Sequence, residues 1–97
     1  MNIKFLAEAK LEYESTVLYY ETARPGFGDV FVAAFKEAIG RIKDFPEAWD
    51  PIDHRYRRCM LKRFPFGVIY ERLPDFIQIV AVMDLRRDPD YWKPRVT

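Results

Sequence analysis

The chain has 97 residues, enough for one domain with a single hydrophobic core (residues 1–97) and too few for two. Its formal net charge of +1 argues against a general nucleic-acid binder, because such domains are clearly basic. The single cysteine, Cys59, excludes an internal disulfide and fits a reducing cytoplasm. No apolar run reaches the roughly 18 residues of a membrane span, so we expect a soluble cytoplasmic protein with no membrane contact.

The charge is distributed unevenly along the chain. Residues 1–53 contain six Lys/Arg and ten Asp/Glu, whereas residues 54–97 contain ten Lys/Arg and five Asp/Glu. We therefore expect an acidic helical half and a basic sheet half, with the basic half facing an acidic partner.

The first half of the chain predicts a short strand followed by two helices. Asn2–Phe5 is expected to form an edge strand. The segment from Ala7 to about Ala23 is rich in Ala, Leu and Glu and contains no Gly or Pro, which favours a helix. Arg24–Gly28 breaks this helix with a proline and two glycines, and a second helix is expected from about Asp29 to Asp44.

The two predicted helices differ in how their apolar residues are arranged. In the first helix these residues lie on several sides, so we expect much of its circumference to be buried. They are Leu11, Tyr13, Val17, Leu18 and Tyr20. In the second helix they form one stripe with steps of three and four residues, which predicts a single buried face. The stripe contains Phe31, Ala34, Phe35, Ala38, Ile42 and Phe45.

The second half of the chain predicts strands after a loop at Phe45–Pro51. We expect strands at Arg55–Arg63, Gly67–Arg72 and Phe76–Met83, with a tight turn at Leu73–Asp75 before the last one. Helices that are segregated from an antiparallel meander make an α+β domain. The predicted fold is an N-terminal edge strand, a helical hairpin packed on one face of the meander, and a short C-terminal turn or helix.

The segment Ile79–Trp92 is the most informative part of the chain. Its apolar start predicts a strand buried on both faces, in the middle of the sheet. Arg86 and Arg87 follow where this strand reaches solvent. They are placed either to bind phosphates or carboxylates or simply to solvate the strand end, and both interpretations remain open. Asp84 beside them is either a base or, more in keeping with its neighbours, the partner of an arginine.

Most standard catalytic signatures are absent from the sequence. There is no Gly-rich phosphate loop, and one histidine with one cysteine cannot build a zinc site, so we expect neither cofactor nor metal. His54 is expected to be a solvated loop residue and Cys59 a small core residue. What remains is a set of basic residues near aromatic ones. They are Arg57, Arg58, Lys62, Arg63, Arg86, Arg87, Lys93 and Arg95.

These residues leave two functions open. A nuclease without metal or histidine would use arginines to stabilise charge on the phosphate and Lys or Tyr to handle protons, with Tyr91 or Trp92 stacked on a base. A binding surface for an acidic protein segment would use the same arginines and aromatics as anchors.

Several segments of the chain also match a known pattern. They are Glu12, Tyr19–Glu21, Phe45–Pro46, Arg63–Tyr70, Ala81–Val82 and Arg86–Trp92. With this order of elements, the chain resembles the RelE/ParE superfamily of toxins from type II toxin–antitoxin modules, also called plasmid-stabilisation proteins. The resemblance spans nearly the whole chain and is closer to the ParE-type branch. It implies a cytoplasmic toxin that arrests growth and is neutralised by a cognate antitoxin.

The resemblance implies one of two targets. ParE-like members inhibit DNA gyrase without nuclease residues, whereas RelE-like members cleave mRNA on the ribosome. A RelE-like mRNA interferase would use Arg63, Arg87 and Tyr91 as catalytic residues. In either branch the resemblance implies binding contacts at positions beside them, which are Lys62, Asp84, Arg86 and Trp92.

Whether the chain is an enzyme therefore depends on its branch. Asp84 occupies a position where relatives with the same Tyr-Trp ending often carry histidine. A third alternative is thus a decayed toxin that only binds its antitoxin. The sequence fixes neither the antitoxin type nor the oligomeric state.

Overall fold

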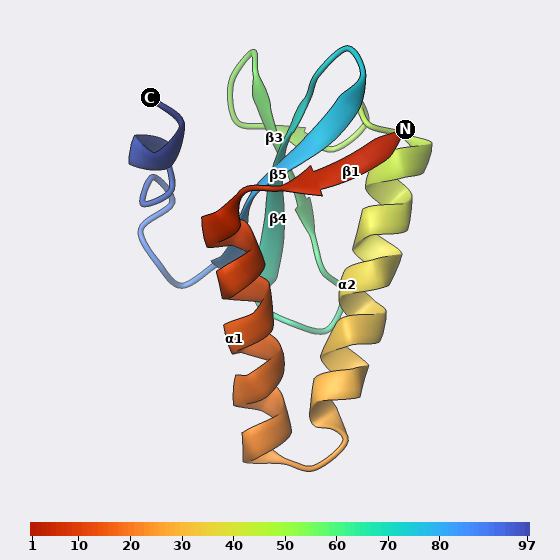
Figure 1. Ribbon diagram of the computed structural model, residues 1–97, viewed down its shortest axis with the longest axis vertical. Helices are drawn as coiled ribbons and strands as arrows, with labels where there is room; N and C mark the ends of the chain where they lie inside the picture. The colour runs from red at the N-terminus through yellow and green to blue at the C-terminus, as the bar shows by residue number, and fades with distance from the viewer.

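The structure is a computed structural model that describes residues 1–97, and it contains one sheet, two long helices and a C-terminal 3-10 turn (Figure 1). The elements are β1 (Asn2–Phe5), α1 (Ala7–Ala23), α2 (Phe27–Asp44), β2 (Asp50–Pro51), β3 (Tyr56–Met60), β4 (Phe66–Arg72), β5 (Phe76–Asp84) and η1 (Lys93–Val96). The predicted α+β fold, with its helical hairpin and short C-terminal turn, is confirmed. No helix of this fold combines the length and the apolar character needed to cross a membrane.

The sheet has the strand order β1-β5-β4-β3-β2. The strands β2 to β5 pair antiparallel in sequence order, whereas β1 lies parallel to β5 at the edge of the sheet. β5 is therefore an inner strand, as its continuous apolar sequence predicts, and Ile79–Met83 is buried throughout. A register shift in the β4–β5 pairing, where Ile69 opposes Ala81 and Tyr70 opposes Ile79, leaves Val80 as an extra residue.

Two strands differ from the prediction at their ends. The expected loop at Phe45–Pro51 contains the two-residue strand β2, which pairs with β3. β3 ends at Met60 rather than at Arg63, and Arg63 itself has a φ of 72°, which is incompatible with an extended strand. The Leu61 amide donates to the Phe66 carbonyl over 2.9 Å and closes the connection to β4.

The helical hairpin covers one face of the sheet and forms the main core. The apolar stripe of α2 is confirmed at its inner positions, where Phe31, Phe35, Ala38 and Ile42 are buried, but Phe45 is 63% exposed beyond the last helical turn. Aromatic side chains from both helices, from β4 and from the connection before it meet in this core at ring-centroid distances of 5.0 to 5.5 Å. They include Tyr20, Phe27, Phe31, Phe64 and Phe66.

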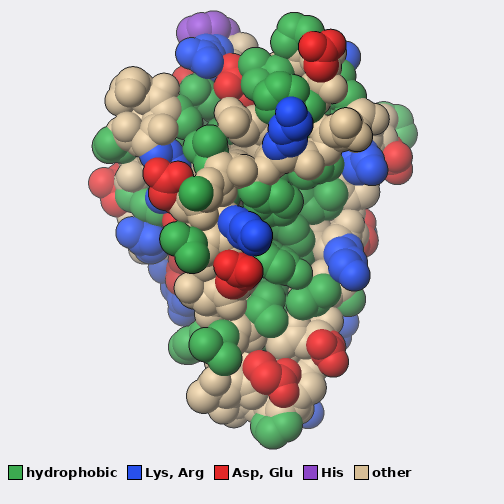
Figure 2. Space-filling view, in the orientation of Figure 1, with side chains coloured by type: hydrophobic (Ala, Val, Ile, Leu, Met, Phe, Trp, Pro, Cys, Tyr) green, Lys and Arg blue, Asp and Glu red, His purple; other side chains and the backbone are tan.

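The expectation that α1 is buried around much of its circumference is wrong. Only Ala9 is fully buried, and Leu11, Leu18 and Tyr19 remain 62%, 66% and 65% exposed. Figure 1 shows the reason, because α1 contacts α2 and β5 on its inner side and the hairpin extends beyond the end of the sheet. In the space-filling view, apolar side chains gather on the front of the molecule between the two helices (Figure 2).

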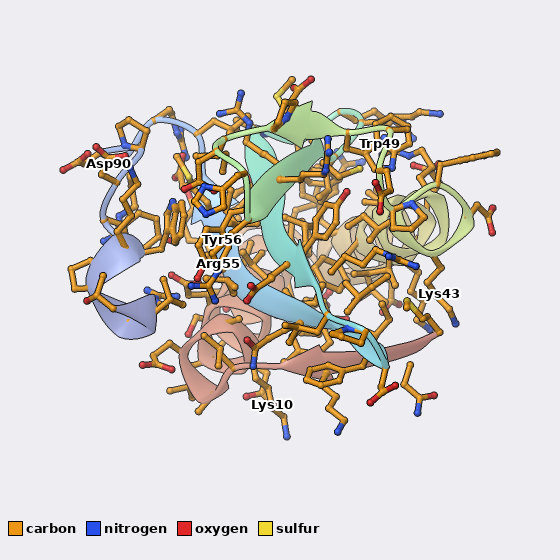
Figure 3. The ribbon with its side chains drawn as sticks, turned by 90° about the horizontal axis from the view of Figure 1, so that it is seen from above. Lys10, Lys43, Trp49, Arg55, Tyr56 and Asp90 are labelled. Atoms are coloured by element: carbon orange, nitrogen blue, oxygen red, sulfur yellow. The ribbon has the colours of Figure 1, made fainter.

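The C-terminal segment, residues 85–97, covers the other face of the sheet and forms a second core. Trp92 is fully buried there, packs edge-on against Tyr56 at 5.2 Å, and donates its indole N–H to the Pro89 carbonyl over 2.8 Å. Seen from above, η1 and α2 lie on opposite sides of the sheet, with Tyr56 on the side of the C-terminal segment and Trp49 beside α2 (Figure 3). Trp92, near the end of the chain, is thus a central residue of the second core.

Candidate functional site

The Glu12 carboxylate of α1 gathers donors from two other parts of the chain. It accepts the Tyr91 hydroxyl at 2.6 Å and two guanidinium nitrogens of Arg95 at 3.0 and 3.3 Å. The Val82 amide of β5 donates to the same carboxylate over 3.0 Å. Arg95 in turn donates to the Val80 carbonyl over 3.1 Å. We call Glu12, Tyr91 and Arg95 the C-terminal clamp.

The clamp forms where β5 extends beyond the end of its neighbour β1. β1 ends at Phe5, which pairs with Ile79, so β5 continues beyond the last residue of its neighbour. Backbone groups of a buried strand need partners, and an unpaired one costs free energy. The Glu12 carboxylate and the Arg95 guanidinium supply these partners at Val82 and Val80, which fixes the C-terminal segment against the strand.

Tyr91 is held from several sides. Its hydroxyl donates to Glu12, while the guanidinium carbons of Arg87 and Arg95 lie 3.9 and 5.2 Å from its ring centroid. Burial raises the pKa of Tyr91, and the hydrogen bond to Glu12 raises it further. Arg87 itself is exposed, and its stacking on Tyr91 fixes its position.

Asp84 pairs with Arg86, as its neighbours predict. The Arg86 amide and its Nε donate to one Asp84 oxygen at 2.9 Å, and its Nη2 donates to the other at 2.7 Å. The Arg86 side-chain hydrogen bond is the main reason why the pKa of Asp84 is lowered. Both groups are thus fully charged at neutral pH and already satisfy each other.

A groove runs between α1 and the end of β5. Two adjoining hollows share Ser15, Thr16, Phe66 and Asp84, and a third continues along the exposed side of α1 past Leu18. We call this surface the α1–β5 groove. Its lining residues are Leu11, Glu12, Ser15, Thr16, Tyr19, Tyr20, Phe66, Val82, Asp84, Arg86 and Arg87. The groove therefore combines exposed apolar side chains with the two arginines that follow β5.

The other predicted site residues lie apart from this groove. Arg63 is exposed in the β3–β4 connection and forms no hydrogen bond or ion pair, although the Leu85 amide donates to Pro65 and brings that connection to the end of β5. Lys62 is 70% exposed and lies 3.8 Å from Glu37 of α2. The structure therefore does not join Lys62 and Arg63 to Arg87 and Tyr91 in one pocket.

Three further residues have clear positions. Trp92, which was predicted as a binding contact, is buried at 0% exposure, and its side chain packs in the second core. His54 is exposed in the loop before β3. Cys59 is buried in the main core, as predicted, and burial raises its pKa, which makes the thiol unreactive.

The clamp shows what the sequence did not reveal. In the sequence, Glu12 is only part of a family pattern and Arg95 is only one of many basic residues. Tyr91 and Arg95 follow Glu12 by 79 and 83 positions, so no local spacing connects the three.

Comparison with known proteins identifies the group to which this fold belongs. A family model described as the ParE toxin of the type II toxin–antitoxin system parDE matches residues 3–89. A search of curated proteins finds no match. The matched range ends at residue 89, so the clamp residues Tyr91 and Arg95 lie just beyond it.

A solved structure agrees with this assignment at the level of the fold. The structure described as the chromosomal ParDE toxin–antitoxin system from P. aeruginosa superposes with a TM-score of 0.65 at 15% sequence identity, covering 88% of this chain and 96% of that one. Since the family match covers most of the chain, the assignment rests on it. The chain belongs to the ParE family of toxins from type II toxin–antitoxin systems.

Proposed function

We propose that this toxin arrests growth by binding and inhibiting DNA gyrase in the cytoplasm, and that it does not cleave mRNA. The family assignment supplies the role of toxin and implies an antitoxin partner. The observation that favours gyrase over ribosome-bound mRNA is the hydrogen bond between the Tyr91 hydroxyl and Glu12.

A general acid or base works best when its pKa lies near the operating pH. Tyr91 is the only one of the three candidate nuclease residues that could exchange a proton, because arginine stays charged. Its hydroxyl is occupied by Glu12 and its pKa is raised away from neutrality, mainly by burial. Arg63 lies in a separate loop and Arg87 stacks on the Tyr91 ring, which supports a contact role for both.

The α1–β5 groove offers the contacts that such a role needs. Leu11 and Tyr19 are largely exposed at its rim, and Arg87 stands at its end. Exposed aromatic and arginine side chains often dominate the energy of a protein interface. We propose that gyrase binds the toxin at this groove.

The test compares two activities of the same purified protein. Wild-type toxin is added to gyrase in a DNA supercoiling assay, and primer extension is performed on translated mRNA in a parallel reaction. We expect supercoiling to be blocked and no new RNA ends to appear. Tyr91→Phe keeps the ring beneath Arg87 and removes the hydroxyl, so it should still inhibit gyrase.

The opposite result would identify a ribonuclease. Cuts in ribosome-bound mRNA that disappear in Tyr91→Phe and Arg87→Ala, with gyrase unaffected, contradict the proposal. A protein that affects neither system and allows growth when expressed without its antitoxin would be a decayed toxin.

A further inference from the structure

Arg58 of β3 is the one buried arginine donor in the chain that has no acceptor. Its Nε is shielded from solvent and forms no hydrogen bond, and no ion pair involves its guanidinium. Asp50 is its cross-strand partner in register, yet their charged groups do not come within 4.0 Å. By contrast, Arg41, Arg55 and Arg95 all pair with carboxylates of the same chain.

A neighbouring glycine leaves the space in which the Arg58 side chain packs. A Cβ atom at Gly67 of β4 would lie 3.1 Å from both Cγ and Cδ of Arg58 and 3.3 Å from a methyl group of Leu85. Any side chain at this position would therefore displace the arginine stem. Glycine here allows the Arg58 stem to pack directly over the backbone of β4, which limits its freedom before a partner binds.

Arg58 lies on the face of the sheet opposite the helical hairpin. Side chains alternate along a strand, and Cys59 points into the main core, whereas Tyr56 belongs to the second core beneath the C-terminal segment. Met60, two residues further on the same face, is 45% exposed. The surroundings of the guanidinium are thus partly apolar and partly open to solvent.

We infer that Arg58 is an anion-binding residue that is completed by an Asp or Glu side chain of the antitoxin. A guanidinium pairs with a carboxylate through two parallel N–H···O bonds, which would give the buried Nε its missing acceptor. A protein carboxylate fits better than nucleic acid, because the chain has a net charge of only +1 and Met60 and Leu85 provide apolar contacts beside the charge. The antitoxin residue is therefore an acidic side chain with an apolar neighbour.

This inference goes beyond the proposed target, because it rests on the antitoxin and not on gyrase. The toxin is released from its complex with the antitoxin, refolded, and titrated with antitoxin by calorimetry. Arg58→Gln should weaken the affinity about tenfold or more, because it removes one partner of a buried charge pair. Arg72→Gln removes the same charge from a surface arginine that already pairs with Glu47 and should change the affinity by less than about threefold.

Two further measurements separate binding from folding. The thermal midpoint of free Arg58→Gln should not fall, since Arg58 has no partner within the chain to lose. If this variant does not fold, Arg58→Lys keeps the charge and most of the stem, and it should weaken binding by a smaller factor because it lacks the planar fork. Gly67→Ala should weaken binding in the same direction by displacing the stem.

The partner residue is found by neutralising each antitoxin carboxylate in turn. One Asp→Asn or Glu→Gln substitution should lose its effect in the presence of Arg58→Gln, which is the signature of a direct pair. Equal affinities for Arg58→Gln and Arg72→Gln, or the absence of any coupled carboxylate, would overturn the inference. A loss of gyrase inhibition with unchanged antitoxin affinity would also overturn it, by assigning Arg58 to the target.

Discussion

The Tyr91 hydroxyl donates a hydrogen bond to the Glu12 carboxylate over 2.6 Å and so connects the last residues of the chain to its first helix. Arg95 adds an ion pair to the same carboxylate, and the side chains of both ionic partners are largely buried, with exposures of 14% and 18%. The C-terminal segment is therefore held by a specific polar contact as well as by the packing of Trp92.

Replacing Glu12 should destabilise the protein. Glu12→Gln keeps the shape of the side chain but removes the charge that Arg95 and Tyr91 require, and we expect a loss of about 2 kcal/mol in the free energy of unfolding. Urea denaturation measures this change. Glu14→Gln on the exposed side of the same helix is the control and should stay within about 0.5 kcal/mol. Equal losses for the two variants would mean that the clamp adds little.

Two glycines of α2 should respond to alanine in opposite ways. A Cβ at Gly28 would lie 3.0 Å from the Val17 carbonyl oxygen and 2.9 Å from a Glu21 oxygen, so Gly28→Ala should force the helices apart and cost about 1–3 kcal/mol. A Cβ at Gly40 meets nothing within 4 Å, and Gly40→Ala should stabilise the helix by about 0.5–1 kcal/mol. Thermal unfolding of the two variants checks the prediction, which fails if both shift in the same direction.

Acid should weaken the fold partly through Asp84. Its pKa is lowered in the folded state, chiefly by the Arg86 side chain, so its contribution is present above the unfolded value of about 3.9 and disappears as the pH falls below the folded value. Asp84→Asn should therefore show a smaller decrease in unfolding free energy between neutral pH and about pH 2 than the wild type does. Asp53 has a similarly lowered pKa and should retain its own contribution in this variant. Parallel pH profiles for the two proteins would exclude the Asp84–Arg86 pair as a source of the acid response.

The exposed side of α1 should matter for toxicity and not for folding. Leu18 is 66% exposed, so Leu18→Asp should change the unfolding free energy by less than about 0.5 kcal/mol. If this side belongs to a protein interface, the same substitution should allow cells to grow when the toxin is expressed without antitoxin. Growth arrest at wild-type strength, with wild-type protein levels on an immunoblot, would remove Leu18 from the contact surface.

The sequence predicted the parts of this fold that depend on local patterns. Both helices, the edge strand and the buried run of β5 follow from spacing and composition over short windows. The exposure of Leu11 and Leu18 could not be predicted, because the sequence does not say whether another element packs on that side of the helix. The elements that contact α1 are α2, β5 and β1, and Leu11 and Leu18 remain exposed beside these contacts.

The candidate site was only partly predictable. The pairing of Asp84 with an arginine follows from their proximity in sequence, whereas the role of Glu12 depends on a residue 83 positions away. The sequence does not distinguish Arg58 from the other basic residues of β3, because its position depends on Gly67 of the neighbouring strand β4. Such cross-strand relationships become visible only when the register of the sheet is known.

The early end of β1 has a consequence for solubility. A strand that outruns its neighbour exposes unpaired N–H and C=O groups, and such an edge recruits strands from other molecules and promotes aggregation. Here the Glu12 carboxylate accepts from the Val82 amide, and the Arg95 guanidinium donates to the Val80 carbonyl. These backbone groups of β5 are therefore not available to a strand of another molecule. The last residues of the chain thereby protect its most apolar strand from joining that of another copy.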